Sequence, residues 1–141
     1  MDTRTADQVL LATARLVTGI SVRAADQVGD LTPVQLRALT VVRQLGPLNL
    51  VQLTEALGVT VSTTSRLVDR LVAADLVDRR PSEVTRREIS LTLTAHGADV
   101  LRSYDRLRVQ ALRERLHRLP PEDQQTVLDA LALLTDERAA G

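Results

Sequence analysis

Apolar residues that recur every three or four positions predict amphipathic helices at the start of the chain. One helix is expected over residues 5–28 and a second over residues 33–45. Thr32 precedes a proline and stands three residues before Gln35, which is the pattern of a capping box at a helix start. A Gly-Pro pair that begins at Gly46 stops the second helix. The expected core face of this second helix consists of Leu36, Leu39, Val42 and Leu45.

Two short helices joined at a glycine are predicted next, in the pattern of a helix-turn-helix. The first covers residues 50–57, between Asn49 as its N-cap and Gly58 as its end. The second starts after Thr60, and its apolar side consists of Val61, Thr64, Leu67, Val68, Leu71 and Val72. The opposite side carries Ser62, Arg66, Asp69, Arg70 and Ala73, with Thr63 and Ser65 on the flanks. Small residues and arginine at the amino end of a helix suit the reading of base edges in a major groove.

An alternation of apolar and polar residues predicts two strands around a turn directly after these helices. The strands are expected over residues 76–80 and 88–93, with residues 81–85 as the turn. Four arginines against one acid, Glu83, give the stretch 79–87 a local net charge of plus three in a chain of zero net charge. A basic tip next to a recognition helix can reach the minor groove or its phosphates. The alternative is a solvated charge cluster that discourages strand-edge pairing, and in either case the arginines are Arg79, Arg80, Arg86 and Arg87.

Two further helices are predicted after the hairpin. Thr94 caps a long one that ends at the pair Pro120-Pro121, where the last helix begins. The first and last helices of the chain each have an apolar stripe, which either closes one intramolecular core or pairs with a second copy. A two-fold dimer is favoured because a single winged module buries too little surface on DNA for high specificity, whereas a dimer reads two half-sites about 10 bp apart.

The predicted fold is therefore mainly α with a small β-hairpin, a winged helix-turn-helix with long flanking dimerisation helices. A chain of 141 residues is long enough for one domain with its own core. We expect that single domain over residues 1–141, with the winged core at about 31–94 and dimerisation helices at about 5–28 and 95–137.

Composition narrows the function further. The chain is 44% hydrophobic and 26% charged, and no apolar run reaches the ~18 residues of a membrane span or forms a secretory signal, so a cytoplasmic protein is expected. The absence of cysteine removes disulfides, thiolate metal ligands and thiol redox sensing. Tyr104 is the sole aromatic residue, which argues against stacking on single strands and favours duplex DNA as the partner.

The predicted DNA contacts are Ser62, Thr63, Ser65, Arg66, Arg70, Arg79, Arg86 and Arg87. Arg66 is the strongest candidate for base reading, because its forked guanidinium can pair with guanine in the major groove. Arg70 is expected to contact a phosphate or to pair with an acid of its own helix. The alternative function, from a different class, is a winged-helix module for protein interactions that docks an acidic partner through the hairpin arginines.

The chain has no catalytic or metal-binding pattern. His96 and His117 are far apart and lack a partner at ligand spacing. The hydroxyl residues around Ser62 have no nearby histidine or lysine to activate a nucleophile, and no glycine-rich phosphate loop occurs. We therefore expect neither an enzyme nor a metal or other cofactor.

In order and spacing, several motifs of the chain resemble those of the MarR (multiple antibiotic resistance regulator) family. They are Leu31-Thr32-Pro33-x-Gln35-x-x-Ala38-Leu39, Leu53-x-x-Ala56-Leu57-Gly58, Ser62-x-x-Ser65-Arg66-Leu67-Val68-x-x-Leu71, Leu76-Val77-x-Arg79, and Arg86-Arg87 ahead of Leu91-Thr92-x-Thr94-x-x-Gly97. The resemblance covers nearly the whole chain. It implies a homodimeric winged-helix transcription regulator, usually a repressor, that is dimerised by its terminal helices and often released from a palindromic operator by a small ligand.

The resemblance also implies roles for individual residues. Those that it places in the major groove are Ser62, Thr63, Ser65 and Arg66. Arg86 or Arg87 is implied as the wing arginine near the minor groove. Thr85 departs from the pattern, because the family usually has an acid just before the paired arginines, and Glu83 would have to serve from two residues away. Without cysteine, a small-molecule effector must bind non-covalently or act through another residue, and its pocket is expected between the dimerisation helices and the DNA-reading lobe.

Overall fold

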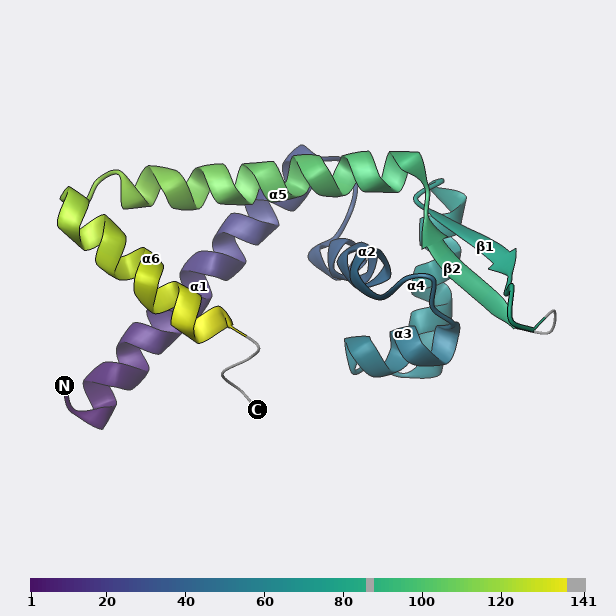
Figure 1. The fold of residues 1–141 in the computed structure, drawn as a ribbon, viewed down its shortest axis with the longest axis horizontal. Helices are drawn as coiled ribbons and strands as arrows, with labels where there is room; N and C mark the ends of the chain where they lie inside the picture. The colour runs from purple at the N-terminus through teal and green to yellow at the C-terminus, as the bar shows by residue number, and fades with distance from the viewer. Residues whose placement is uncertain (86–87, 137–141) are drawn as a thin grey trace.

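The computed structural model describes residues 1–85 and 88–136. Along these ranges the chain forms, in order, α1 (Thr3–Gln27), α2 (Pro33–Leu45), α3 (Leu50–Leu57), α4 (Val61–Ala73), β1 (Val77–Pro81), β2 (Ile89–Leu93), α5 (Ala95–Leu116) and α6 (Pro121–Thr135). The two strands pair antiparallel as a hairpin that projects from a lobe of short helices (Figure 1). The predicted fold class, mainly α with a small β-hairpin in a winged helix-turn-helix, is confirmed.

Local sequence signals set the helix ends. At the start of α2 the Thr32 hydroxyl accepts a hydrogen bond from the Gln35 N–H at 3.2 Å, and the Gln35 side chain accepts one from the Thr32 N–H at 2.9 Å. Asn49 and Gln52 form the same reciprocal pair before α3, at 2.8 and 2.9 Å. Gly58 ends α3 in the left-handed conformation at φ 67°, which glycine adopts without a Cβ penalty. The capping boxes and the glycine end are as predicted.

Three boundaries of the hairpin differ from the prediction, and one of them is the start of β2, which lies at Ile89 and not at residue 88. Leu76 is not part of β1, because its N–H bonds back to Leu71 O at 2.9 Å in the turn that closes α4. Pro81, predicted as the first turn residue, is the last residue of β1 and pairs with Ile89. A proline is tolerated at the end of an edge strand, where no N–H donor is needed. The alternation of apolar and polar residues indicates which way side chains point, and it does not fix where strand pairing stops.

The core lies where α2, α3, α4 and α5 meet the hairpin. Its largest fully buried side chains are Leu36, Leu39, Leu53, Leu71, Leu76, Leu101, Val68, Val77 and Thr64. Leu48 ties the segment between α2 and α3 to the hairpin, because it exchanges backbone hydrogen bonds with Leu91 at 2.8 and 3.3 Å. Leu45 and Val61, which their spacing assigned to the core, are instead 57% and 55% exposed. Each is the terminal residue of its helix and lies outside the packed turns.

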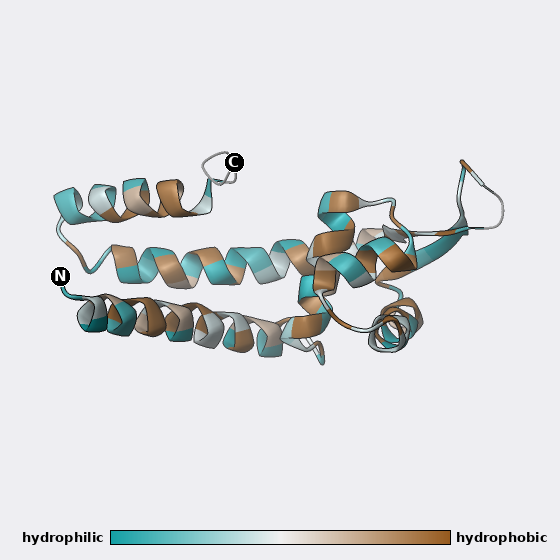
Figure 2. Ribbon diagram, turned by 90° about the horizontal axis from the view of Figure 1, so that it is seen from below, coloured by the Kyte–Doolittle hydropathy of each residue, from teal (hydrophilic) through white to brown (hydrophobic). Residues whose placement is uncertain are grey.

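The helices α1, α5 and α6 form an arm that extends away from the hairpin (Figure 1). α1 packs along α5, and the buried residues of α1 are Ile20, Ala24 and Ala25. In the view of Figure 2, α5 runs between α1 and α6. α6 has no buried residue along its length. None of the described helices combines the length and the apolar content that crossing a bilayer requires.

Candidate nucleic-acid interface

One buried side holds α4 in the fold. Its buried residues are Thr64, Leu67, Val68 and Leu71. The hydroxyl of the completely buried Thr64 donates to Thr60 O at 2.9 Å, so this polar group is satisfied. The helix contacts α3 and β1. Its other side therefore faces solvent at the end of the molecule that carries the hairpin (Figure 1).

The predicted major-groove residues lie on or beside the solvent-facing side of α4. Ser62, Thr63 and Arg66 are exposed, and Ser65 is half-buried. The Thr63 N–H donates to the Thr60 hydroxyl oxygen at 3.2 Å, and Thr63 Oγ1 accepts from that hydroxyl at 2.9 Å. The hydrogen of the Thr63 hydroxyl is then left to donate to an outside acceptor. The amino end of α4 thus presents small hydroxyl side chains and one guanidinium, which are groups that donate to base edges and phosphates.

Arg66 and Arg70 are exposed cations on α4. Neither forms an ion pair within residues 1–85 and 88–136. The acid next to Arg70, Asp69, pairs instead with Arg79 of the hairpin. Of the two roles predicted for Arg70, the ion pair within its own helix is therefore not seen in the described part of the chain. Both guanidinium groups are available to an external anion.

The described hairpin arginines are held by neighbouring acids. Arg79 on β1 pairs with Asp69 on α4, across the junction between the hairpin and this helix. Arg80 pairs with Asp78, two residues away on the same strand, at 3.3 Å. These two pairs offset part of the positive charge that the sequence places on the hairpin.

The predicted wing contacts Arg86 and Arg87 lie outside the described residues. Ser82 precedes these two residues and Glu88 follows them. The Ser82 N–H donates to Glu88 O at 2.8 Å, which adds one backbone hydrogen bond beyond the end of the paired strands. Glu83 is exposed and forms no ion pair in the part of the chain that the structure describes. The predicted substitution of Glu83 for the acid that the family usually has before its paired arginines is not tested by these contacts, because both arginines lie outside the described residues.

Two apolar residues at the amino end of α4 were not predicted as part of this surface. Val59 and Val61 flank the N-cap Thr60 and are 37% and 55% exposed. An apolar side chain in a major groove can contact the methyl group of thymine. Helical periodicity assigned Val61 to the core, because the periodicity cannot show that the first turn of α4 extends past its neighbours.

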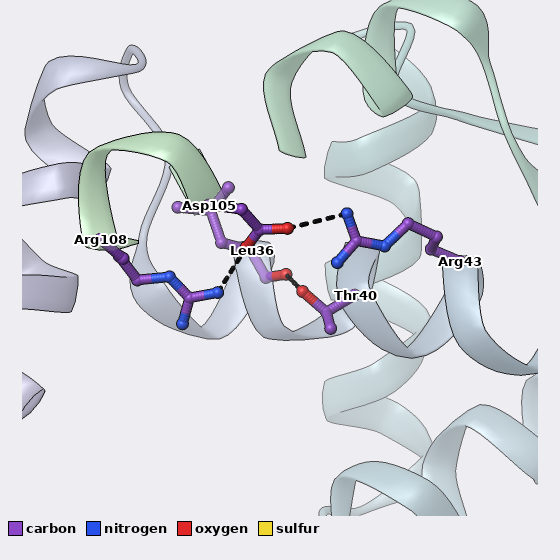
Figure 3. A network of polar contacts seen from close by, with 5 residues as sticks. All are labelled: Leu36, Thr40, Arg43, Asp105 and Arg108. Carbon is purple, nitrogen blue, oxygen red and sulfur yellow. Dashed lines mark hydrogen bonds and ion pairs between the residues drawn. The ribbon is translucent and has the colours of Figure 1, made fainter. Parts of the chain in front are cut away.

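A network of ion pairs joins the arm to the winged lobe, which consists of α2, α3, α4 and the hairpin (Figure 3). Asp105 on α5 pairs with Arg43 on α2 at 2.9 Å and with Arg108 of its own helix at 2.6 Å. Burial raises the pKa of Asp105, but the hydrogen bonds from Arg108 and Arg43 outweigh that effect and leave this pKa below its ordinary value. Arg108 also lies over the Tyr104 ring, 4.1 Å from its centroid. The network links α5 to α2, which packs against α3 of the helix-turn-helix.

An open pocket of about 330 Å³ lies beside this network, between α1, α2 and α5. Apolar and hydroxyl side chains line it together with two arginines, Arg37 and Arg108, and no acid. Arg37 also reaches the end of α3, where its guanidinium donates to Leu57 O at 3.2 Å. The described residues contain no cluster of side chains that would hold a metal ion. The pocket lies where the first and fifth helices of the chain meet α2, and nothing in the structure shows what it binds.

Comparison with known proteins bears on the identity of this fold. A protein-family model, that of the MarR family, matches residues 31–89, which run from just before α2 to the first residue of β2. The crystal structure of RV1404 from Mycobacterium tuberculosis matches with a TM-score of 0.87 at 34% sequence identity, over 97% of this chain and 94% of that one. The chain belongs to the MarR family.

Two curated proteins agree with membership of the MarR family. The chain is 29% identical over 106 residues to YfiV, an uncharacterized HTH-type transcriptional regulator of Bacillus subtilis, and the match covers 75% of this chain and 66% of that protein. It is 28% identical over 102 residues to the multiple antibiotic resistance protein MarR of Escherichia coli, over 72% of this chain and 71% of that protein. MarR family members are transcription regulators, so this chain is a transcriptional regulator and not an enzyme.

Proposed function

We propose that this MarR family regulator is a homodimeric repressor that binds a palindromic operator in the cytoplasm and leaves it when a small ligand binds non-covalently. The observation that carries the proposal is the polar amino end of α4, which faces outward beside the hairpin while the other side of the helix is buried. A helix of 13 residues held in this way fits a major groove. Residues 1–141 act as one unit in this proposal, with the winged core at 31–94.

The DNA contacts follow from which groups are free to meet DNA. The proposed base-facing residues are Ser62, Thr63, Ser65 and Arg66. Arg66 is assigned to a guanine, because it is exposed and has no acidic partner among the described residues. Arg70 and Arg79 are assigned to phosphates, which position the protein without reading sequence. Arg86 or Arg87 is assigned to the adjacent minor groove.

The second copy is proposed to pair through the arm. The large apolar residues that α1 exposes are Val9, Leu10, Leu11, Val17 and Val22, and those that α6 exposes are Leu128, Leu131, Leu133 and Leu134. Exposed apolar surface on both terminal helices is typical of an interface between protein chains. Pairing there leaves both winged lobes free and allows two copies of α4 to meet half-sites about 10 bp apart.

Release of DNA is proposed to begin in the pocket between α1, α2 and α5. A ligand that binds this pocket more tightly in one orientation of the winged lobe shifts the population toward that orientation. In a dimer, a change in the angle between arm and lobe also changes the spacing of the two recognition helices. The operator tolerates only the spacing that matches its half-sites, so affinity falls.

Selection of bound duplexes from a random pool tests the DNA and dimer parts of the proposal together. The expected result is a two-fold-symmetric consensus with half-sites about 10 bp apart. Enrichment of a single, asymmetric half-site would overturn the dimer. If no duplex is enriched even at low salt, the protein does not act on DNA.

Fluorescence anisotropy on the selected operator and on a scrambled duplex separates the roles of the arginines. Arg66→Ala is expected to weaken operator binding by about 1–3 kcal/mol and to relax sequence choice at one position, with little change on the scrambled duplex. Arg86→Ala or Arg87→Ala is expected to weaken binding to both duplexes and to reduce its salt dependence. Unchanged affinity in both of these variants would overturn the wing assignment.

A further inference from the structure

The ion pair between Asp69 and Arg79 connects the recognition helix to the hairpin. Asp69 lies on the side of α4 opposite its buried residues, and Arg79 lies on β1. It is the one ion pair between α4 and the hairpin among residues 1–85 and 88–136. Both side chains remain accessible, at 60% for Asp69 and 39% for Arg79. An acid therefore stands on the surface that the proposed function turns toward DNA.

A carboxylate in this place has two opposite effects on DNA binding. Its negative charge repels the phosphates of an approaching duplex. It also restrains the long side chain of Arg79, which otherwise loses rotational freedom when it settles on a phosphate. Only Nη2 of Arg79 is used in the contact with Asp69 Oδ1, so the remaining N–H groups of the guanidinium are left for another acceptor.

We propose that Asp69 is a positioning residue for DNA binding: it holds Arg79 at the junction of recognition helix and hairpin, so that the free donors of Arg79 meet a phosphate. The benefit from this restraint exceeds the repulsion from the Asp69 charge. The proposal rests on the function proposed above, because it requires a duplex against α4. It gives a role to an acid of this surface, whereas the residues predicted to contact DNA were all hydroxyl residues and arginines.

The role of Asp69 can be tested without unfolding the protein. An ion pair with this degree of exposure contributes little to stability, because water screens the charges. Asp69→Asn keeps the size of the side chain and removes its charge. Asp78→Asn is the matched control, because Asp78 also pairs with an arginine of β1 and does not link the hairpin to α4. Circular dichroism and thermal unfolding confirm that each variant is folded.

The experiment is a double-mutant cycle of operator affinity, measured by anisotropy over a range of salt concentrations. Asp69→Asn is expected to weaken binding about tenfold although it removes a negative charge, which is within the range for coupled residues in contact. Arg79→Gln is expected to weaken binding by a similar factor and to flatten the salt dependence. The double variant should bind no worse than Arg79→Gln alone, and Asp69→Glu should restore most of the affinity. Asp78→Asn should leave the affinity unchanged or raise it.

Three results would overturn the proposal. Tighter binding by Asp69→Asn would show that the carboxylate only repels DNA. Additive losses in the double variant would show that Asp69 acts without Arg79, and an equal loss in Asp78→Asn would show that the link to α4 is irrelevant. Failure of the function proposed above is a separate result, because the unmodified protein would then bind no duplex at all, and Asp69 would have no DNA contact to position.

Discussion

Gly97 occupies a position where a larger residue does not fit. A Cβ at this position would lie 2.2 Å from Leu76 O, which is a backbone atom directly before β1. The same corner is closed by Thr94, whose hydroxyl donates to Asp75 O at 2.6 Å and accepts from the Gly97 N–H at 2.9 Å. The glycine that stands three residues after Thr94 in the family-like motif therefore has a packing explanation: it lets α5 begin in direct contact with the end of the helix-turn-helix.

Gly97→Ala is expected to lower the free energy of unfolding by about 1–3 kcal/mol, as is usual when extra atoms are forced into a packed site. Gly19→Ala in α1 is the control, and it is expected to raise the free energy of unfolding. Its Cβ would meet only the flexible Arg23 guanidinium, at 3.4 Å, and alanine favours a helix over glycine by roughly 0.5–1 kcal/mol. Urea unfolding followed by circular dichroism measures both changes. Equal stability of the Gly97→Ala and unmodified proteins would show that the corner relaxes without cost.

At the scale of elements, Asp105 links α5 to α2. Asp105→Asn removes the carboxylate that Arg43 and Arg108 share, and at about pH 7 it is expected to lower the free energy of unfolding by about 1 kcal/mol. The value lies below that of a fully buried charged pair, because the Asp105 side chain is 31% exposed. Asp99→Asn is the matched control on the same helix. Its partner Arg102 is three residues away, both side chains are well exposed, and the expected change is at most about 0.5 kcal/mol.

The Asp105 contribution depends on pH with a definite sign. Folding lowers the pKa of this carboxyl, so its stabilising effect is complete above the ordinary carboxyl range of about pH 4 and is lost as the pH falls through the lowered pKa. The difference in stability between the unmodified protein and Asp105→Asn should therefore stay constant from neutral to mildly acidic pH and shrink on further acidification. Thermal unfolding over this range measures it. A difference that grows on acidification would contradict the assigned pKa direction.

Features were predicted well where they depend on residues close together in the sequence, and poorly where they depend on a distant element. Thr32 and Asn49 act on the N–H groups three residues away, so the sequence alone placed the starts of α2 and α3. The partner of Asp69 was not predictable, because helical spacing relates it to positions three and four residues away and contains no information on a strand residue such as Arg79. The strand limit at Pro81 was wrong for the same reason, since it is set by the residue opposite.

At the scale of the whole molecule, periodicity predicted the apolar stripes of the arm but not the surface that covers them. Ile20, Ala24 and Ala25 of α1 are buried, so α1 is partly covered within one copy. The stripe of α6 is different, because none of its residues is buried within residues 1–85 and 88–136. Of the two alternatives left open by the sequence, an intramolecular core thus accounts for part of α1, whereas the apolar side of α6 is left uncovered by the described residues.

Charge placed on α6 should therefore separate the proposed dimer. Leu128 and Leu131 are 48% and 40% exposed and stand three residues apart, so both side chains lie on one side of the helix. The double variant Leu128→Glu/Leu131→Glu is expected to have half the mass of the unmodified protein in sedimentation equilibrium. Its affinity for a two-half-site operator should fall roughly a hundredfold or more, because two linked contacts become independent.

The control for this variant is Val34→Glu on α2, an apolar residue of similar exposure, 54%, that lies outside the arm. A glutamate in the first turn of a helix is compatible with its dipole, so this protein should fold and remain dimeric. Circular dichroism separates dissociation of the α6 variant from unfolding. A folded α6 variant with an unchanged mass would show that α6 does not form the interface. Loss of the dimer with full operator affinity would instead show that a single winged lobe is sufficient for binding, so that the arm serves a purpose other than spacing two recognition helices.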